Sequence, residues 1–446
     1  MAFPRGRGSI GSRCSGTRVW QRVTCVEALG ARLVACRPHV NSSRSPGHHP
    51  SQDELSQRRT PGGRPRATAL AALLALVAGC APAVPDDARP GDGNIPQPQP
   101  VSTGSYQVGA YYFPGWPSQV KWKVLAAFPE RTPLLGYYRE GDPDVMDWQI
   151  KWAVEHGISF FAFDWYWDRG HRQLEHALHD GYLRARFRSF IKFCLLWANH
   201  NPPSSSSEAD LLTLLDHWIA QYFRQPEYLT VDGKPVVIVF SPRLLRKDMG
   251  SEAVGVAIRR MRARVEAAGF RGLFLVGAVG ADPAALAALE AEGYDAATGY
   301  NYPRAGMQDE AAREAPYDTA VDGYERIWAD MAAARILDYI PVTEPGWDSR
   351  PWHGAKALVR TGRHPDKFRD MLGRARAFTD RHPVAERKKL VLIEAWNEYG
   401  EGAVIEPHRE WGFAYLDAVR DVFGASRGRH RDLTPGDLGL TVPTAP

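Results

Sequence analysis

Strand-like and helix-length segments alternate from residue 106 to about residue 423, and this rhythm restricts the possible folds more than any other feature of the chain. Short runs rich in β-branched and aromatic residues are separated by amphipathic stretches, a pattern typical of repeated βα units with a parallel sheet. The pattern predicts eight strands, at residues 107–113, 158–164, 191–197, 236–240, 273–279, 296–300, 339–343 and 390–395. It predicts helices at residues 144–156, 173–185, 209–223, 252–268, 283–292, 324–336, 365–380 and 412–423.

Eight β/α pairs are the number found in a (β/α)₈ barrel of the TIM type. The sequence therefore predicts an α/β protein with a single such barrel over residues 106–425. The alternative is a doubly wound open sheet, which normally carries a glycine-rich phosphate-binding turn after its first strand. Here the first predicted strand runs into Tyr112-Phe113-Pro114-Gly115-Trp116, which lacks that glycine spacing and is too bulky for a backbone to approach a pyrophosphate.

Charge is distributed unevenly along the chain. Residues 1–79 contain twelve arginines, no lysine and three acidic residues, a local charge of +9, whereas residues 80–446 carry a net charge of −5. A nucleic-acid-binding domain needs its basic charge on the folded body. The sequence therefore predicts no nucleic acid partner.

An apolar run at residues 69–77 follows Arg64 and Arg66 and ends in Val77-Ala78-Gly79-Cys80. A basic region, an apolar region and a small-residue cleavage site occur in the order of a secretory signal, and the run is shorter than the ~20 residues of a membrane-spanning helix. Its end resembles a bacterial lipobox, which implies lipidation of Cys80 and a lipoprotein anchored in the cell envelope, facing the periplasm or the exterior. The alternative is an Ala/Leu-rich helix that ends in Gly-Cys.

The flanking segments lack helical or strand periodicity. Residues 1–66 form an Arg-rich leader that is disordered or results from an upstream start, residues 67–80 are the signal segment, and residues 81–105 read as a Pro/Gly-rich linker. Residues 426–446 are predicted to be a flexible tail. Cys194 is the only cysteine of the body, which excludes a disulfide framework or a thiolate zinc site there, and no metal or cofactor is expected.

Aromatic, carboxylate and amide side chains are concentrated where the predicted strands end. In a (β/α)₈ barrel the loops after the strands build the active site. Aromatic faces stack on sugar rings, and carboxylates and amides pair with hydroxyl groups, so the set predicts a glycan-binding site. The alternative is that the aromatic residues cap the barrel core and that Asp164 forms a salt bridge at the rim. The predicted substrate-binding residues are Tyr112, Trp116, Asp164, Trp165, Trp167, Asn199, His200, Tyr300, Trp347, Asp348, Trp396, Asn397 and Tyr399.

Three carboxylates, Glu394, Glu398 and Glu401, fall within eight residues after the last predicted strand. Different environments would push their pKa values apart, and a separated acid and base is what glycosidic cleavage requires. With Gly400 between them and Gly402 after, Glu398 and Glu401 are expected to point from a tight turn into one cavity. The alternative is a solvated acidic loop.

Five ordered motifs, GAYYFPGW, QIKWAVEHGISFFAFDWYW, KFCLLWANH, PGWDSRPW and EAWNEYGEGAVIEP, resemble the glycoside hydrolase family 99-like proteins, including their WbsX-like group. The resemblance runs from about residue 109 to residue 423. It implies a (β/α)₈ barrel and endo-α-mannosidase-type chemistry that retains the anomeric configuration through a 1,2-anhydro sugar. By position, Glu398 would be the base on the sugar 2-OH and Glu401 the general acid. Gly400 stands where the hydrolase branch carries a histidine.

Three functions remain open from the sequence, all with a polysaccharide or glycan as partner. The first is a glycoside hydrolase. The second is a glycosyltransferase of surface-polysaccharide synthesis, against which the lipobox argues, because nucleotide-sugar donors are lacking outside the cytoplasm. The third is a non-catalytic glycan-binding lipoprotein, which would not need the pair Glu398 and Glu401. The sequence predicts no particular oligomeric state.

Overall fold

The computed structural model describes residues 95–385, 387–425 and 430–445. The predicted leader, the signal segment with Cys80 and the linker up to residue 94 lie outside the described residues. Within the described residues, none of the helices has both the length and the apolarity needed to span a bilayer.

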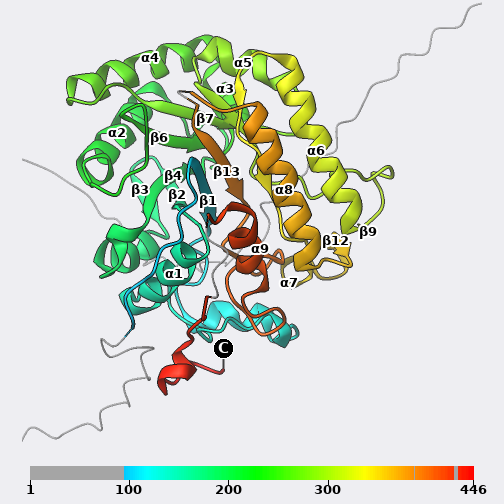
Figure 1. The fold of residues 1–446 in the computed structure, drawn as a ribbon. Coiled ribbons are helices and arrows are strands. Elements are labelled where there is room, and N and C mark those ends of the chain that lie inside the picture. The colour runs from blue at the N-terminus through cyan, green and yellow to red at the C-terminus, as the bar shows by residue number, and fades with distance from the viewer. Residues whose placement is uncertain (1–94, 386, 426–429, 446) are drawn as a thin grey trace, which may run out of the picture. The chain divides into compact units, whose positions relative to one another are not determined.

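One parallel sheet forms the centre of the fold, with helices around its outside (Figure 1). Each predicted strand has a counterpart in it. The order of the strands in the sheet is β10, β8, β7, β6, β4, β2, β1, β13 and β11. Their bounds are β1 Tyr106–Tyr112, β2 Phe160–Asp168, β4 Lys192–Trp197, β6 Lys234–Val239, β7 Phe274–Ala278, β8 Ala296–Thr298, β10 Asp338–Tyr339, β11 Val342–Thr343 and β13 Lys389–Ile393.

The seventh predicted strand is divided into β10 and β11. These two pieces pair with strands at opposite ends of the strand order and so close the sheet. β10 pairs with β8 on one side, whereas β11 pairs with β13 on the other. The Ile340 amide donates to the Ala297 carbonyl (2.8 Å), and the Leu392 amide donates to the Pro341 carbonyl (3.0 Å). Pro341 has no N–H with which to continue the ladder. The single predicted strand is therefore two short pieces, and the predicted (β/α)₈ barrel is confirmed.

The helices pack on the outer face of the barrel, and three of them begin at a residue whose side chain caps the first turn. Asp142 caps α1 by accepting from the Asp144 amide (3.0 Å), and Pro143 occupies the first turn, where a missing N–H is tolerated. The main helices are α1 Pro143–Glu155, α2 Glu208–Trp218, α3 Pro242–Met249, α4 Ser251–Ala267, α5 Ala285–Glu292, α6 Tyr317–Ala334, α7 Arg350–His353, α8 Pro365–Arg381 and α9 Ala414–Phe423. α3 and α7 were not predicted.

The region after β2 differs from the helix predicted at residues 173–185. β2 continues to Asp168 and turns back into the antiparallel strand β3 (His171–Gln173). Arg169 and Gly170 form the turn with φ of 48° and 88°, the positive values of a type I′ hairpin. Only short helical turns follow, at Ala177–Gly181 and Tyr182–Arg184.

The described residues on either side of the barrel differ from the extended linker and the flexible tail that the sequence predicts, because they are packed against the barrel. The Val101 amide donates to the Val154 carbonyl at the end of α1 (3.0 Å), and Ile95 is buried. In the C-terminal segment, residues 430–445, the Leu433 carbonyl accepts from the Trp152 indole (2.8 Å), and the Pro443 carbonyl accepts from the Tyr137 amide (2.9 Å). This segment is therefore packed against the barrel.

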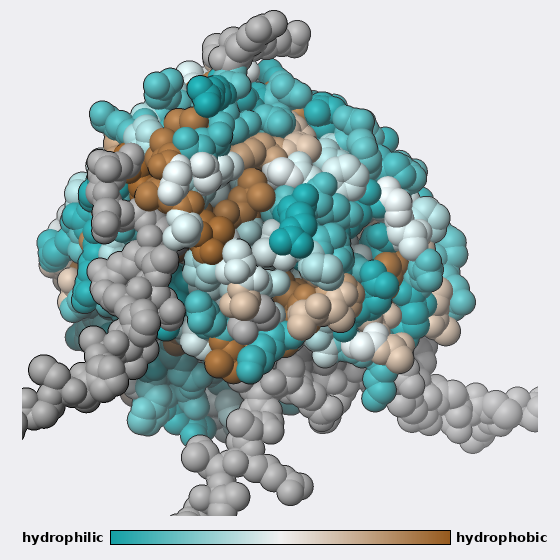
Figure 2. Space-filling view, turned by 90° about the horizontal axis from the view of Figure 1, so that it is seen from below, coloured by the Kyte–Doolittle hydropathy of each residue, from teal (hydrophilic) through white to brown (hydrophobic). Residues whose placement is uncertain are grey.

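The hydrophobic side chains lie mainly in the core of the barrel and under its helices. Figure 2 shows one face of the molecule, on which hydrophobic residues form small groups between hydrophilic ones. Among the described residues, Val120 stands out as a large hydrophobic side chain that is 65% exposed.

Candidate functional site

A short hairpin after β13 carries the two predicted catalytic carboxylates. β14 (Asn397–Glu398) pairs antiparallel with β15 (Ala403–Val404), and residues 399–402 form the turn. Gly402 has a φ of 72°, a left-handed conformation that favours glycine. Glu398 therefore lies on the short strand β14 and Glu401 in the turn that follows it, whereas the spacing of the glycines predicts both in one tight turn.

Three contacts fix the backbone of this turn. Arg131 donates to the Tyr399 carbonyl (3.2 Å), the Asp348 amide donates to the Glu401 carbonyl (2.6 Å), and Arg363 donates to the Gly402 carbonyl (3.1 Å). The Asp348 carboxylate is in turn held by Arg131 and by Arg350. The position of Glu401 is thus set by a preorganised loop.

Asn397 fastens the hairpin to the loop after β1. Its side-chain nitrogen donates to the Phe113 carbonyl (2.8 Å) and to Glu140 (2.9 Å), and its side-chain oxygen accepts from the Phe113 amide (2.9 Å). Glu140 also accepts from the Trp116 amide (2.8 Å). Because its amide is engaged by the protein on both sides, Asn397 positions Glu398.

Tyr300, just after β8, joins two acidic side chains from distant parts of the chain. Its hydroxyl lies 3.2 Å from an oxygen of Asp164 and 3.2 Å from an oxygen of Glu398. A hydroxyl carries one proton and can donate to only one oxygen at a time. Both contacts are hydrogen bonds only if one of the two carboxyl groups is itself protonated.

The pKa values agree with a proton held in this group. Burial raises the pKa of Asp164 well above its usual value, the Tyr300 hydroxyl opposes this shift, and the charge of Glu401 adds to it. Burial also raises the pKa of Glu398, together with the charge of Asp164, and Tyr300 again opposes the rise. Two like charges in a dry site disfavour simultaneous ionisation.

Further carboxylates surround this pair. Burial raises the pKa of Glu401 well above its usual value, and the charges of Glu398 and Glu344 add to the rise. Glu394, at the end of β13, is fully buried, and burial with the charge of Glu344 raises its pKa as well. Burial is the largest cause of the raised pKa in all three of Glu394, Glu398 and Glu401, whereas the hydrogen-bonding and charged neighbours of the three groups differ.

Glu344 follows β11 and contacts the same group. Its carboxylate accepts from the Tyr324 hydroxyl (2.6 Å), and burial raises its pKa to about 7. Glu344 was not among the predicted site residues, and Glu394 was named with Glu398 and Glu401 but given no role. The signal for both is a carboxylate directly after a buried strand.

Aromatic rings line one side of the acidic group. Tyr300 stacks on Tyr111 with ring centroids 4.9 Å apart and meets Phe240 edge to face at 5.2 Å. His200 contacts both Phe240 (5.3 Å) and Tyr166 (5.6 Å), and burial lowers its pKa, so that its ring is neutral at pH 7. Tyr166, absent from the predicted set, is half-buried beside these rings.

Six of the other predicted aromatic residues are part of the barrel packing. The Tyr112 hydroxyl donates to Gln149, and the Tyr399 hydroxyl donates to Glu406 (both 2.9 Å). Trp116 stacks on Trp122 at 4.1 Å, and the Trp165 and Trp167 indoles donate to Tyr222 and Asp210. Trp396 is fully buried against Phe161. None of these contacts is with Asp164, Tyr300, Glu398 or Glu401.

Three remaining predicted residues also make structural contacts. Asn199 exchanges two hydrogen bonds with the Ser241 backbone, at 2.9 and 2.7 Å. Trp347 packs in a small separate cluster with Leu358 and Ala403. Asp348 is the turn-holding carboxylate described above. The structure therefore brings together Asp164, Tyr300, Glu398 and Glu401, with His200 at the edge.

Residues 128–419 match the model of a family described as glycosyltransferase WbsX, and the chain belongs to this family. A curated relative, the uncharacterized protein WxcX of Xanthomonas campestris pv. campestris strain B100, is 31% identical over 316 residues. The alignment covers 66% of this chain and 43% of the relative, so the chain spans less than half the length of the curated relatives that it matches.

The fold resembles solved glycoside hydrolase structures. A glycoside hydrolase-like protein superposes with a TM-score of 0.56 at 21% identity, over 76% of this chain and 99% of that one. The family GH99 endo-α-mannosidase of Bacteroides thetaiotaomicron, in complex with BIS-TRIS propane, gives a TM-score of 0.52 at 15% identity, over 71% and 95% of the two chains. The chain therefore has a glycoside hydrolase-like barrel.

Proposed function

We propose that this protein is a glycoside hydrolase that cleaves α-mannoside-type or related linkages in a polysaccharide or glycan. The observation that carries the proposal is the contact of the Tyr300 hydroxyl with both Asp164 and Glu398. It marks a group of acidic side chains that share protons at the carboxyl ends of the barrel strands, where barrel enzymes have their active sites.

Hydrogen bonding distinguishes the two catalytic carboxylates. Glu398 has a donor in Tyr300, which stabilises its ionised form. Within the described residues, no hydrogen-bond donor contacts the carboxyl group of Glu401, whose pKa is raised by burial and by the charge of Glu398. When the pair loses its first proton, Glu398 is the group that ionises and Glu401 keeps its proton. Glu398 is thus the base and Glu401 the acid.

The proposed chemistry uses these states directly. Glu398 takes the proton of the sugar 2-OH, the resulting oxygen attacks the anomeric carbon, and the leaving glycosidic oxygen takes the proton of Glu401. The product is a 1,2-anhydro sugar. Water then opens the anhydro ring, with Glu401 accepting a proton from the water and Glu398 returning its proton to the sugar oxygen. This step restores the starting protonation state of both carboxyl groups, and the anomeric configuration is retained.

A glycosyltransferase is the second candidate, and the description of the family favours it. Its donor would carry a nucleotide diphosphate, which Asp164, Glu344, Glu394, Glu398 and Glu401 repel whenever they are ionised. Phosphates are usually held by arginine, lysine or oriented backbone amides. The acidic character of the site therefore supports hydrolysis of a neutral glycan over transfer from a nucleotide sugar.

The test is product release by the purified full chain from a panel of α-mannans and bacterial polysaccharides. We expect oligosaccharides from the wild type, none from Glu398→Gln or Glu401→Gln, and wild-type yields from Glu290→Gln, which changes an exposed carboxylate on α5. Retained glycan binding in the inactive variants would separate lost chemistry from lost folding. Near-normal activity of either site variant would contradict its role. Activity only when a nucleotide sugar is added would identify a transferase.

A further inference from the structure

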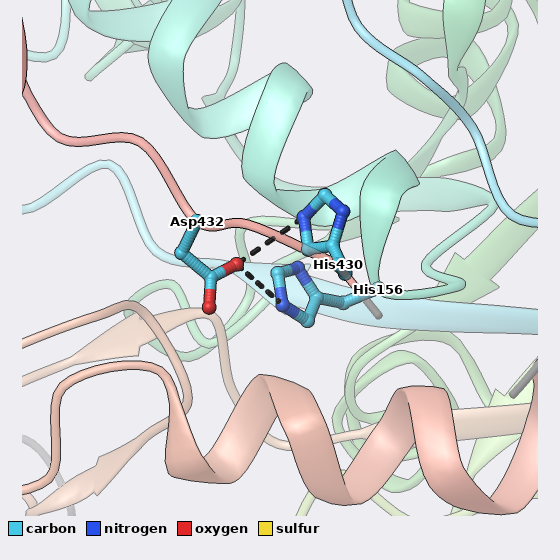
Figure 3. Close-up of side chains that lie close together, drawn as sticks. All are labelled: His156, His430 and Asp432. Carbon is cyan, nitrogen blue, oxygen red and sulfur yellow. Dashed lines mark ion pairs between the residues drawn. The ribbon is translucent and has the colours of Figure 1, made fainter. Parts of the chain in front are cut away.

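Two histidines and an aspartate from opposite ends of the folded body meet beside the end of α1 (Figure 3). His156 follows the last residue of α1, whereas His430 and Asp432 belong to the C-terminal segment. The Nε2 atoms of both histidines lie 3.2 Å from the same oxygen, Oδ1 of Asp432. All three of these atoms lie within 4.8 Å of one another.

The buried ring of His156 is oriented toward this group. Its Nδ1 atom lies 2.7 Å from the Trp152 carbonyl, which fixes the ring and leaves Nε2 directed at Asp432. His156 is fully buried, and its Nε2 atom has no hydrogen-bond partner. The same is true of the buried atoms His430 Nε2 and Asp432 Oδ1. Buried polar atoms are normally hydrogen-bonded, so a bound ligand would account for three such atoms that face one another.

The spacing of these atoms fits a metal ion. Zinc bonds of about 2.0–2.1 Å in tetrahedral geometry place neighbouring ligand atoms about 3.3 Å apart. The two separations of 3.2 Å to Asp432 match that edge. A histidine ligand commonly donates its other ring N–H to a backbone carbonyl, as the contact of His156 with Trp152 allows.

We propose that His156, His430 and Asp432 form a zinc site that joins the C-terminal segment to α1. Two imidazoles and one carboxylate are donors suited to zinc. Two more carboxylates stand nearby: Oδ1 of Asp417 on α9 lies 3.6 Å from His156 Nε2, and Oε2 of Glu155 lies 3.5 Å from His430 Nε2. Either of them or a water molecule completes the tetrahedron.

The site has a structural role and is independent of the proposed glycosidase activity. Its ligands come from α1 and from a segment that follows the last barrel helix, so metal binding crosslinks the two. This proposal departs from the sequence-based expectation of no metal site. His430 and Asp432 lie more than 270 residues from His156 along the chain, and only the folded tail brings them together.

Zinc titration of the chelator-treated full chain, followed by calorimetry, tests the proposal. We expect one zinc ion per chain, a higher melting temperature with zinc, and at least tenfold weaker binding in His430→Ala and in Asp432→Asn. His171→Ala removes an exposed histidine on β3 and serves as the matched control with unchanged binding. His430 and Asp432 are more exposed than His156, which makes their variants the ones expected to fold.

Cobalt(II) gives a second readout. Substitution at this site should produce the intense visible bands of tetrahedral cobalt, and these bands should be lost in His430→Ala. Failure of the wild type to bind zinc, or equal binding by wild type and both site variants, would overturn the proposal. The three residues would then form a metal-free cluster held by the ion pair between His156 and Asp432. Neither result depends on glycan cleavage.

Discussion

The indole ring of Trp352 lies against the backbone of Gly400, in the turn between the two proposed catalytic residues. A β-carbon at position 400 would come within 1.8 Å of the Trp352 ring nitrogen. Trp352 also lies parallel to Trp116, with ring centroids 5.9 Å apart. A tryptophan from α7 therefore occupies the space that a side chain at position 400 would need.

Gly400→Ala should displace Trp352 and lower the free energy of unfolding by about 1–3 kcal/mol, the usual cost of overpacking. The loss should be smaller in a Trp352→Ala background, because the clash is then absent. Thermal or urea unfolding of the four proteins measures this coupling. Gly373→Ala is the control: nothing lies within 4 Å of a β-carbon there, and alanine stabilises a helix interior relative to glycine. Equal losses in both backgrounds would contradict the contact.

Tyr300→Phe should leave the fold intact, since the ring contacts with Tyr111 and Phe240 remain. It removes the hydroxyl that lowers the pKa of Glu398 and of Asp164, so both pKa values should rise further. We expect the acidic limb of the pH–activity profile to move to higher pH. Since hydrogen bonds to charged groups contribute about 1.5–3 kcal/mol, kcat should fall about 10- to 100-fold.

Tyr302→Phe is the matched control for this prediction. It removes a buried hydroxyl whose partners are Tyr339 (2.7 Å) and the Val279 carbonyl (3.3 Å). We expect some loss of stability and no shift of the pH profile. A similar shift in both variants would show that the effect does not arise from the acidic group.

Glu406→Gln should flatten the pH dependence of stability. Burial raises the pKa of Glu406 to about 7, against the hydrogen bonds from Tyr138, Gln149 and Tyr399. The folded state thus binds this proton more tightly than the unfolded chain does. The resulting stability is complete below about pH 4.5 and is lost as the pH rises through about 7, a change of about 3 kcal/mol. Burial also raises the pKa of Glu344 to about 7, so part of the pH dependence of stability should remain in the Glu406→Gln variant.

Urea unfolding between pH 4 and pH 8 measures this effect. Glu290→Gln should leave the curve of the wild type unchanged in shape. If Glu406→Gln retained the full slope, the proton would have to be bound elsewhere.

Cys80→Ala should release the protein from the membrane fraction if the lipobox reading is correct. Cys80 lies outside the described residues, so this remains a proposal from the sequence, as does localisation to the cell envelope. Fractionation of cells that express the full chain provides the measurement, with Cys36→Ala as the control. Membrane association of the Cys80→Ala protein would argue against lipidation.

The repeating pattern of short apolar runs was enough to predict the barrel and the approximate position of each strand. Two details of the fold depend instead on local sequence features. Pro341 within the seventh strand was a signal for a break, and Arg169-Gly170 encoded a hairpin just before the helix predicted at residues 173–185. Both depend on backbone conformation at one or two residues, which periodicity over a longer window does not detect.

The site was predictable in part, because parallel strands end at one face and bring Asp164, Tyr300 and Glu398 together. Other polar residues near the strand ends belong to the same chemical types. Residue type alone therefore did not distinguish them from the residues of the site. Asn397 and Asn199 have the chemistry of sugar ligands, yet their amides are bonded to Phe113, Glu140 and Ser241. Such partners are distant in sequence, and only the three-dimensional packing decides which polar groups remain available.

The packed C-terminal segment changes where this domain can be cut or extended. A protein truncated after residue 425 would lose the Leu433 carbonyl that accepts from the Trp152 indole and the Pro443 carbonyl that accepts from the Tyr137 amide. A reporter or affinity label joined at residue 425 would therefore replace part of the fold, whereas one joined after residue 445 would leave that part intact.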